Sequence, residues 1–226
     1  VEEICMTVDS VGENLLRVKK TIEPYTPNII AVTKYYGLEA ITDAYGAGLR
    51  DFGESRANDA IQKIENLPDE IRKNSKFHFI GHLQTNKVDR VVKHFDYIQS
   101  VDSIKVASAI SESAGRINKV PKILLQINIS GEVQKFGFSE RELYDNFEEL
   151  LKLPNLKIDG FMCMAPLGAS EEELDKVFKK AGQIKSELNK KYSLDLKELS
   201  MGMSDDYERA VANGATMIRL GRILFK

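Results

Sequence analysis

The first residue with chemistry to offer is Lys34, which follows the apolar run NIIAVT. Side chains alternate across a strand, so Ile30, Val32 and Lys34 share one face. If that face points into a barrel, the amine lies at the mouth of an apolar interior. Partial desolvation there favours the uncharged amine, which is a nucleophile toward a carbonyl. The alternative is a lysine that ends a strand in water.

The second such group lies in the stretch LSMGMSDDYERAVANGATMIRLGRILF, residues 199 to 225. Gly202 permits a tight turn, and Ser204 is predicted to cap the helix that follows. First-turn amides bind anions, Arg219 or Arg222 can add charge, and Gly221 lets the backbone approach a ligand. The stretch therefore predicts a phosphate site, provided that the two aspartates after Ser204 face away. The alternative is an ordinary cap and an ordinary turn.

Other polar residues fall inside apolar runs. His78 and His82 share a register in FHFIGHLQTNK, but no third metal ligand follows at ligand spacing, so satisfied structural histidines are favoured over a metal pair. Gln126 and Asn128 share one face of ILLQINIS and need partners, either in a structural network or on a ligand. Met162 is interpreted as core packing that can also form a wall against a flat ring.

These residues need a scaffold, and short apolar runs alternate with amphipathic stretches along the whole chain. The expected strands are Asn28–Thr33, Leu49–Phe52, Phe77–Ile80, Tyr97–Ser100, Lys122–Asn128, Lys157–Met162, Lys197–Leu199 and Thr216–Arg219. The expected helices between them are Leu38–Ala47, Glu54–Glu65, Thr85–Lys93, Ser103–Ala114, Ser139–Leu151, Ser170–Lys190 and Ser204–Asn213. The serines suited to cap their helices are Ser103, Ser139, Ser170 and Ser204.

Eight strands alternating with helices predict an α/β fold, a single (β/α)8 barrel spanning residues 1–226. A doubly wound open sheet is the alternative, disfavoured because no glycine-rich dinucleotide fingerprint follows the first strand. Too few residues follow the last strand for a full closing helix, so the amphipathic segment Ser10–Ile22 is expected to cover that part of the barrel. In this fold, chemistry gathers at the carboxyl ends of the strands, and phosphate is often bound after strands seven and eight.

The composition narrows the function further. The 226 residues are 42% hydrophobic, enough for one core, and a net charge of -2 with interspersed charges argues against nucleic-acid binding. Cys5 and Cys163 fit neither a disulfide framework nor a zinc site and are expected to be reduced thiols. No signal peptide or membrane-spanning run is recognisable, which predicts a cytoplasmic protein without a membrane partner. No long exposed apolar patch is evident, which favours a monomer.

A lysine nucleophile and a phosphate cradle together predict a ligand that carries both an aldehyde and a phosphate. Pyridoxal phosphate fits this description. A sugar phosphate handled by a Schiff-base aldolase fits it too.

Six ordered motifs resemble those of the pyridoxal phosphate homeostasis protein family, over nearly the whole chain. They are AVTK at 31–34, FGES at 52–55, FHFIGHLQTNK at 77–87, LLQINISGEVQKFGF at 124–138, GFMCMAP at 160–166 and the stretch 199–225 quoted above. The resemblance implies a single (β/α)8 barrel like the amino-terminal barrel of alanine racemase. It also implies a protein that binds pyridoxal 5'-phosphate (PLP) through a lysine Schiff base and buffers it for the cell, with PLP-dependent apo-enzymes as potential partners and no established reaction of its own.

The resemblance assigns roles to individual residues. Lys34 would form the Schiff base, and Arg219 would lie near the pyridine nitrogen, where a cationic donor leaves that nitrogen unprotonated. The residues implied around the phosphate are Ser200, Met203, Ser204, Gly221 and Arg222, and the further expected PLP contacts are Ser55 and Met162. Three positions depart from the family pattern, which usually has asparagine at Ser55, tryptophan at Phe77 and threonine at Arg222.

Two other function classes remain open, a small fold-type III racemase or decarboxylase acting on amino acids and the Schiff-base aldolase. Alanine racemase needs a second acid/base on the opposite ring face, supplied with help from an additional β domain, and this chain ends soon after its eighth strand. A general base must also lie within about 2.6–3.2 Å of the proton it takes. Nothing in the spacing of His82 or Tyr36 supports either as that base. We therefore expect a PLP carrier and not an enzyme.

Overall fold

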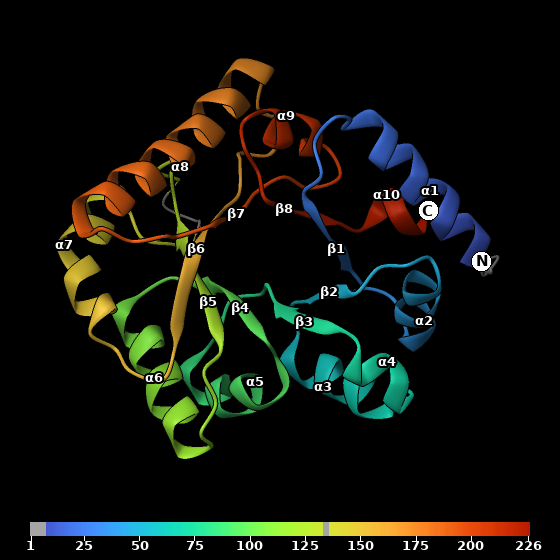
Figure 1. The fold of residues 1–226 in the computed structure, drawn as a ribbon, viewed down its shortest axis with the longest axis horizontal. Helices are drawn as coiled ribbons and strands as arrows, with labels where there is room; N and C mark the ends of the chain where they lie inside the picture. Colours follow the sequence, from blue (N-terminus) through green and yellow to red (C-terminus); the bar gives the residue numbers. More distant parts are fainter. Residues whose placement is uncertain (1–7, 133–135) are drawn as a thin grey trace.

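Eight parallel strands close into a barrel ringed by helices in the computed structural model (Figure 1). The structure describes residues 8–132 and 136–226. The strands are β1 (Asn28–Val32), β2 (Asp51–Glu54), β3 (Lys76–Phe79), β4 (Tyr97–Val101), β5 (Lys122–Ile127), β6 (Lys157–Cys163), β7 (Glu198–Ser200) and β8 (Met217–Leu220). Each strand pairs with the next, and β8 closes the ring on β1 with Ile30 opposite Arg219. The predicted (β/α)8 barrel is confirmed, and the open-sheet alternative is wrong.

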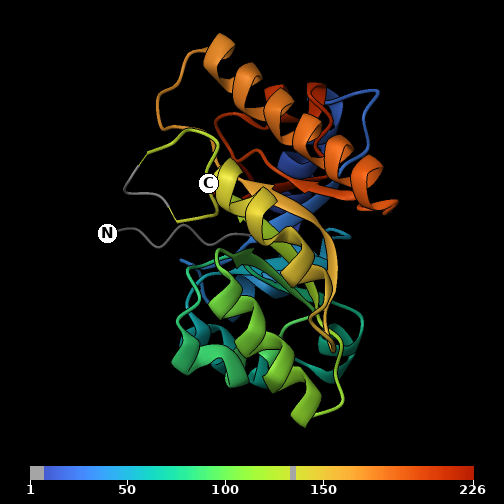
Figure 2. The ribbon, with the colours of Figure 1, turned by 90° about the vertical axis from the view of Figure 1, so that its left-hand side faces the viewer.

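Helices cover the outside of this barrel, as the side view shows (Figure 2). They are α1 (Val8–Thr21), α2 (Leu38–Gly46), α3 (Ala57–Asn66), α4 (Asp69–Lys73), the short 3-10 helix η1 (Thr85–Lys87), α5 (Val88–His94), α6 (Ile104–Arg116), α7 (Glu140–Leu151), α8 (Glu171–Tyr192), α9 (Tyr207–Ala212) and α10 (Arg222–Phe225). The short helices α4 and α10 were not predicted. No helix in the described ranges is long and apolar enough to cross a membrane.

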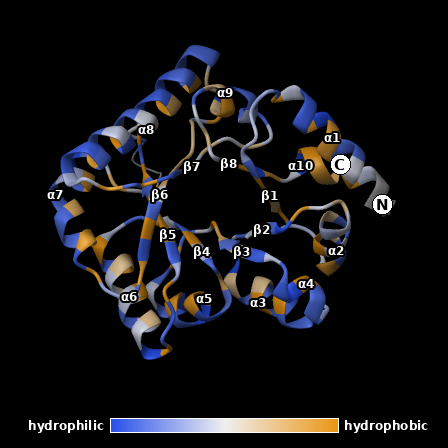
Figure 3. Ribbon diagram, viewed as in Figure 1, coloured by the Kyte–Doolittle hydropathy of each residue, from blue (hydrophilic) through white to orange (hydrophobic). Residues whose placement is uncertain are grey.

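The helices bind the barrel through amphipathic faces, and α8 shows the pattern most fully. Its buried residues recur three or four positions apart and are Leu174, Val177, Phe178, Ala181, Ile184 and Leu188. This spacing places them on one face of a helix. Figure 3 shows hydrophilic residues on the opposite, outward turns of α8. The main core therefore lies between the helices and the outward faces of the strands.

The largest strand error is at β2, predicted as Leu49–Phe52 and observed as Asp51–Glu54. The helix predicted from Glu54 begins instead at Ala57, because Glu54 is still paired in β2 with Phe79 of β3. The predicted helix Thr85–Lys93 divides into η1 and α5.

Three of the four predicted serine caps are confirmed. Ser103 accepts a hydrogen bond from the amide of Val106, and Ser139 and Ser170 each form a capping box. The prediction for Ser204 is wrong, because α9 begins only at Tyr207. The turn before α9 is organised by another residue, described below.

The two ends of the described chain meet at one side of the barrel. In Figure 1, α1 lies beside α10, and the side-chain amide of Asn14 donates to the carbonyl oxygen of Leu224 at 3.1 Å. The expectation that the segment Ser10–Ile22 covers this part of the barrel is confirmed. Cys163 is a free, buried thiol whose pKa is raised to about 12 by desolvation. Cys5 lies outside the described residues, as do residues 133–135 of the fourth motif.

Candidate functional site

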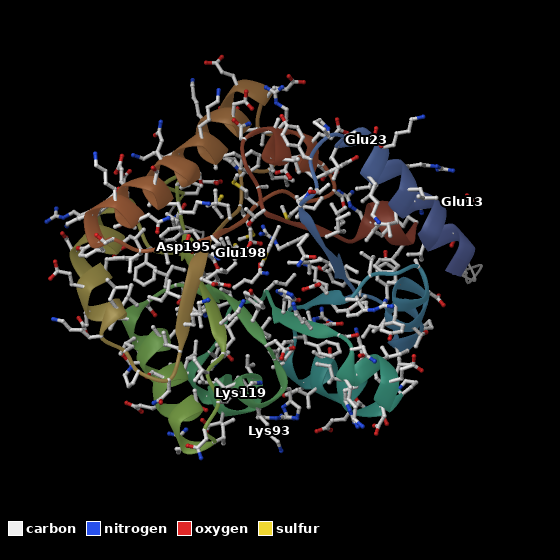
Figure 4. The ribbon with its side chains drawn as sticks, in the orientation of Figure 1. Glu13, Glu23, Lys93, Lys119, Asp195 and Glu198 are labelled. Carbon is white, nitrogen blue, oxygen red and sulfur yellow. The ribbon has the colours of Figure 1, made fainter. Side chains whose placement is uncertain are left out.

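The residues that face the barrel axis come from alternate strand positions. An inner apolar cluster, separate from the main core, contains Ile30, Tyr97, Leu124, Met162 and Met217. Several inward positions between and beyond them carry polar side chains. Figure 4 shows Glu198 of β7 near the axis, whereas Glu13 and Glu23 lie outside the ring of strands. The strands are parallel, so their carboxyl ends open on one face of the molecule, which is called the mouth below.

Lys34 lies at this mouth, two residues beyond β1. Ile30 belongs to the inner cluster, and Val32 packs toward the inward side of Gly53, so the predicted inward face of this strand is confirmed for both residues. Lys34 is half-buried, and its Nζ lies 4.9 Å from the centroid of the Tyr35 ring. Within the described residues its amine takes part in no ion pair. Among these residues, no carboxylate therefore competes with a ligand for the Lys34 amine.

A buried ion pair fixes the backbone from which Lys34 projects. The Nζ of Lys63 donates to Glu54 Oε1 at 2.8 Å and to the carbonyl oxygen of Thr33 at 2.9 Å. The Thr33 hydroxyl donates to the same carboxylate oxygen at 2.8 Å. The Glu54 side chain is only 1% exposed. Removing Lys63 would leave this buried carboxylate without its charged partner, which is strongly destabilising. The ends of β1 and β2 are thus joined to α3 directly before Lys34.

Arg219 of β8 is buried inside the barrel, and its guanidinium is held from two sides. Nη1 donates to the carbonyl oxygen of Ser200 at 2.7 Å and to its hydroxyl at 2.6 Å, and Nη2 donates to the carbonyl oxygen of Cys163 at 3.0 Å. Burial lowers the pKa of Arg219, while Cys163 and the carboxylate of Asp206 oppose that shift. A guanidinium has five N–H donors, so these contacts leave two of them without an acceptor in the described chain.

Ser200 is also linked by hydrogen bonds to further buried polar residues. Its hydroxyl donates to Gln99 Oε1 at 2.7 Å, and Gln99 Nε2 lies 2.9 Å from His78 Nδ1. His78 Nε2 is 2.8 Å from Asp51 Oδ1. Both ring nitrogens of His78 have partners, which confirms the interpretation of this residue as a satisfied buried histidine. Sequence reasoning missed the parts played by Gln99 and Asp51.

The loops after β7 and β8 form the edge of the mouth next to β1. A Cβ added at Gly221 would lie 3.4 Å from the carbonyl oxygen of Val32, so the loop after β8 passes against the end of β1. Gly202 has φ +94, which confirms the tight turn predicted there. Arg222 forms an exposed ion pair with Asp205, with an N–O distance of 2.5 Å.

Asp206 organises the turn at which Ser204 was predicted to cap a helix. Its carboxylate accepts a hydrogen bond from the amide of Met203 at 2.5 Å, and the carbonyl oxygen of Met203 accepts from the amides of Asp206 and Tyr207. The Met203 amide is therefore used within the turn, and the expectation that both aspartates face away is wrong for Asp206, whose carboxylate binds the backbone of this turn. Burial raises the pKa of Asp206, and the hydrogen bond from Met203 and the charge of Arg219 oppose the rise.

Ser55 lines a cavity of about 260 Å³ beside the mouth, together with Arg56, His82 and Lys87. His82 Nδ1 is 3.1 Å from the carboxylate of Asp102. The structure does not bring His82 together with His78, since one lies in this exposed cavity and the other inside the barrel. Among the described residues no cluster of three or more metal-ligating side chains is found.

Gln126 of β5 and Asn128, which directly follows that strand, both donate to backbone carbonyl oxygens. Gln126 Nε2 donates to the carbonyl oxygen of Phe136 at 2.8 Å, and Asn128 Nδ2 donates to that of Glu132 at 2.9 Å. Both hydrogen bonds hold the chain that follows β5. Met162 is 1% exposed in the inner cluster, with Met164 packed against it. Its predicted core packing is confirmed.

Comparison with known proteins agrees with this geometry. The family model for the alanine racemase N-terminal domain matches residues 6–226. A pyridoxal phosphate homeostasis protein from Synechocystis sp. is 45% identical over 202 residues, which cover 89% of this chain and 92% of that protein. The chain belongs to the pyridoxal phosphate homeostasis protein family. The family member from Aquifex aeolicus is 36% identical over 217 residues, covering 95% of this chain and 88% of that protein.

Solved structures of other proteins share the fold of this chain. PipY from Synechococcus elongatus, solved with PLP bound, has a TM-score of 0.86 and 37% identity, covering 96% of this chain and 100% of that one. Alanine racemase from Clostridium difficile has a TM-score of 0.78 at 18% identity, covering 97% of this chain and 57% of that one. The second likeness concerns the fold alone. The sequence resemblance and the barrel it implied are both confirmed.

Proposed function

We propose that this protein binds PLP for intracellular PLP homeostasis, with Lys34 forming the covalent link to its aldehyde. The observation that carries the proposal is the pairing of β1 with β8, which brings Lys34, unpaired within the described residues, and Arg219, with two donors to spare, onto neighbouring strands. The names of its relatives and the PLP bound in PipY support the same ligand.

The donor set at the mouth fits three functional groups of PLP, the aldehyde, the phosphate and the pyridine nitrogen. Lys34 matches the aldehyde, and the cationic Arg222 with the turns at Ser204 and Gly221 matches the phosphate. The spare donors of Arg219 match the pyridine nitrogen, which accepts hydrogen bonds. When bound, PLP supplies an aldehyde conjugated to an electron-withdrawing ring.

Several predicted contacts receive a more specific role in this proposal. The Ser200 hydroxyl is already bound to Gln99 and Arg219, so Ser200 acts by holding Arg219. Met203 lends its backbone to the phosphate-side turn, and Met162 forms part of the wall beneath the ring. Ser55 borders the adjoining cavity, where a small hydroxyl leaves more space than asparagine would.

We propose a carrier and not an enzyme because Arg219 donates toward the ring and does not protonate it. A pyridine nitrogen without its own proton withdraws electrons weakly, which disfavours loss of a proton from a bound amino acid. His78, the histidine inside the barrel, has both ring nitrogens occupied by Asp51 and Gln99. We further propose that the protein works in the cytoplasm as a monomer and that PLP-dependent apo-enzymes receive its cofactor.

The test is an absorbance spectrum of the purified protein with added PLP, before and after borohydride, followed by peptide mapping. We expect a visible band that reduction converts into a stable adduct on the peptide containing Lys34. Lys34→Ala should lose the adduct, whereas Lys87→Ala, which removes another lysine near the mouth, should keep it. A protein that takes up no PLP, or an adduct that persists in Lys34→Ala, would contradict the proposal. Racemisation or decarboxylation of amino acids that disappears in Lys34→Ala would favour the enzyme alternative.

A further inference from the structure

A single line of hydrogen bonds crosses the barrel interior from the mouth to its opposite end. It runs from Arg219 of β8 through Ser200, Gln99 and His78 to Asp51, the first residue of β2. Gln99, His78 and Ser200 are fully buried at 0% exposure. The contacts join residues as far apart in sequence as 99 and 200, so no local motif explains them.

With Gln99 Oε1 facing Ser200 and Nε2 facing His78, the donors and acceptors along this line follow one direction. Arginine only donates, so Ser200 must accept from Arg219 and give its own proton to the oxygen of Gln99. Gln99 then presents its NH2 group to His78, whose Nδ1 must accept. His78 must therefore carry its proton on Nε2 and donate it to Asp51, a carboxylate that accepts. These hydrogen bonds correspond to a His78 ring with its proton on Nε2 and a lone pair on Nδ1.

Asp51 is suited to be the last hydrogen-bond acceptor of this line. Burial alone would raise the pKa of Asp51, but its hydrogen bonds with His78 and Asn28 and the charge of Lys76 hold the pKa below the usual value. The carboxylate therefore stays an acceptor at neutral pH. The line thus begins at a buried cation and ends at a buried anion, and each dipole between them points the same way, an arrangement in which neighbouring hydrogen bonds strengthen one another.

We propose that Asp51, His78 and Gln99 are positioning residues for Arg219. They hold the Ser200 hydroxyl with a lone pair toward the guanidinium, which fixes the edge of Arg219 that carries its two spare donors. Resting on the proposed function, this means that the environment of the ligand's ring nitrogen is set by side chains at the far end of the barrel. The three residues touch no ligand themselves.

The first test uses the wild-type protein with ¹⁵N-labelled histidine, of which the chain has three. We expect NMR to show His78 with an unprotonated Nδ1 and a protonated Nε2, and PLP binding to shift both signals. His94 on the outer helix α5 serves as the internal control and should not move. A protonated Nδ1, a doubly protonated ring, or His78 signals that ignore PLP would overturn the proposal.

The second test compares two substitutions inside the barrel. Gln99→Met removes the central link at similar side-chain length. Tyr97→Phe removes a hydroxyl that is bound to Asp159, outside the line, and leaves the ring stacked on His78. With Gln99→Met we expect PLP still to be trapped on Lys34 by borohydride, but with a displaced absorbance band and affinity weaker by about two- to tenfold. Tyr97→Phe should keep the wild-type band and affinity.

The outcomes separate this proposal from the proposed function. A Gln99→Met protein that is trapped on Lys34 with an unchanged band and affinity overturns the positioning role and leaves PLP binding intact. Equal displacement in Tyr97→Phe overturns it too, because any loosening of the core would then suffice. If wild-type protein takes up no PLP, both proposals fail. If Gln99→Met does not fold, the response of His78 to PLP in the wild-type protein decides.

Discussion

The two ends of the barrel differ in how completely their charged side chains are paired. At the amino-terminal end the carboxylates that face inward are bound by neighbouring side chains. Asp159 accepts from the Tyr97 hydroxyl at 2.8 Å and pairs with Lys122 and Lys157, each at 3.1 Å. Glu198 accepts from the Thr216 hydroxyl at 2.5 Å. The charged side chains at this end are therefore used in contacts that join the strands to one another.

At the mouth, donors are left over instead. Lys34 has an aromatic neighbour but no carboxylate partner in the described chain, and Arg219 keeps two donors. Buried polar groups are normally satisfied within a protein, so the two spare donors of the buried Arg219 favour this end as the place where a ligand binds. The difference shows that the charged groups alone do not locate the site.

The largest effect on stability is expected at the buried ion pair of Lys63 with Glu54 at the mouth. Lys63→Met leaves the carboxylate of Glu54 buried without its partner, and we expect the free energy of unfolding to fall by about 3 kcal/mol. Because Lys63 also holds the carbonyl oxygen of Thr33, PLP affinity should fall as well. Chemical denaturation and PLP titration measure the two effects. The double substitution Lys63→Met with Glu54→Leu is the control and should recover much of the stability.

At the opposite end, Asp159→Ala should destabilise without touching the ligand. Removing this carboxylate breaks charge-assisted hydrogen bonds, at a cost of about 2 kcal/mol, while the half-exposed Lys122 and Lys157 can turn to water. PLP affinity, measured on protein that remains folded, should match the wild type. A clear loss of affinity would contradict the division of the barrel into a structural end and a binding end.

Much of this division could be predicted from the sequence. The alternation of short apolar runs with amphipathic stretches predicted eight strands and the barrel, and the two-residue period placed Ile30 and Val32 on the inward face below Lys34. Each of these inferences needs only neighbouring residues. The strand ends then identified the mouth, because the fold places its chemistry there.

What the sequence did not predict depends on contacts across the barrel. Gln99 lies in an apolar run as Gln126 does, but its partner Ser200 is 101 positions away, and which pair meets depends on strand register. The false cap at Ser204 has a local cause, since three short polar side chains in a row can each cap a helix. The structure shows that Asp206 occupies the Met203 amide, and sequence alone ranks no one of the three first.

The acid dependence of stability should reveal the paired carboxylates at the closed end. Burial by itself would raise the pKa of Asp159, but hydrogen bonds from Tyr97, Lys122 and Lys157 hold it below the usual value. A carboxyl whose pKa is lower when folded contributes stability above its unfolded pKa of about 3.9 and loses it as the pH falls through the folded value. Asp159→Asn should therefore be less stable than wild type at pH 7, with the difference shrinking below about pH 4. Denaturation midpoints at a series of pH values test this, and a constant difference would contradict it.

The smallest effect is expected at the exposed pair of Arg222 with Asp205. Both side chains are more than half exposed, so Asp205→Asn should change the free energy of unfolding by no more than about 0.5 kcal/mol. Removing the carboxylate leaves Arg222 free to meet an anion, and PLP affinity should rise by about two- to threefold at low salt. The gain should fade at high ionic strength, which screens exposed charges. The control is Glu208→Gln, which removes one negative charge from the nearby helix α9 but leaves the pair of Arg222 with Asp205 intact. An equal gain in PLP affinity there would mean that the net charge, and not Arg222, attracts the phosphate.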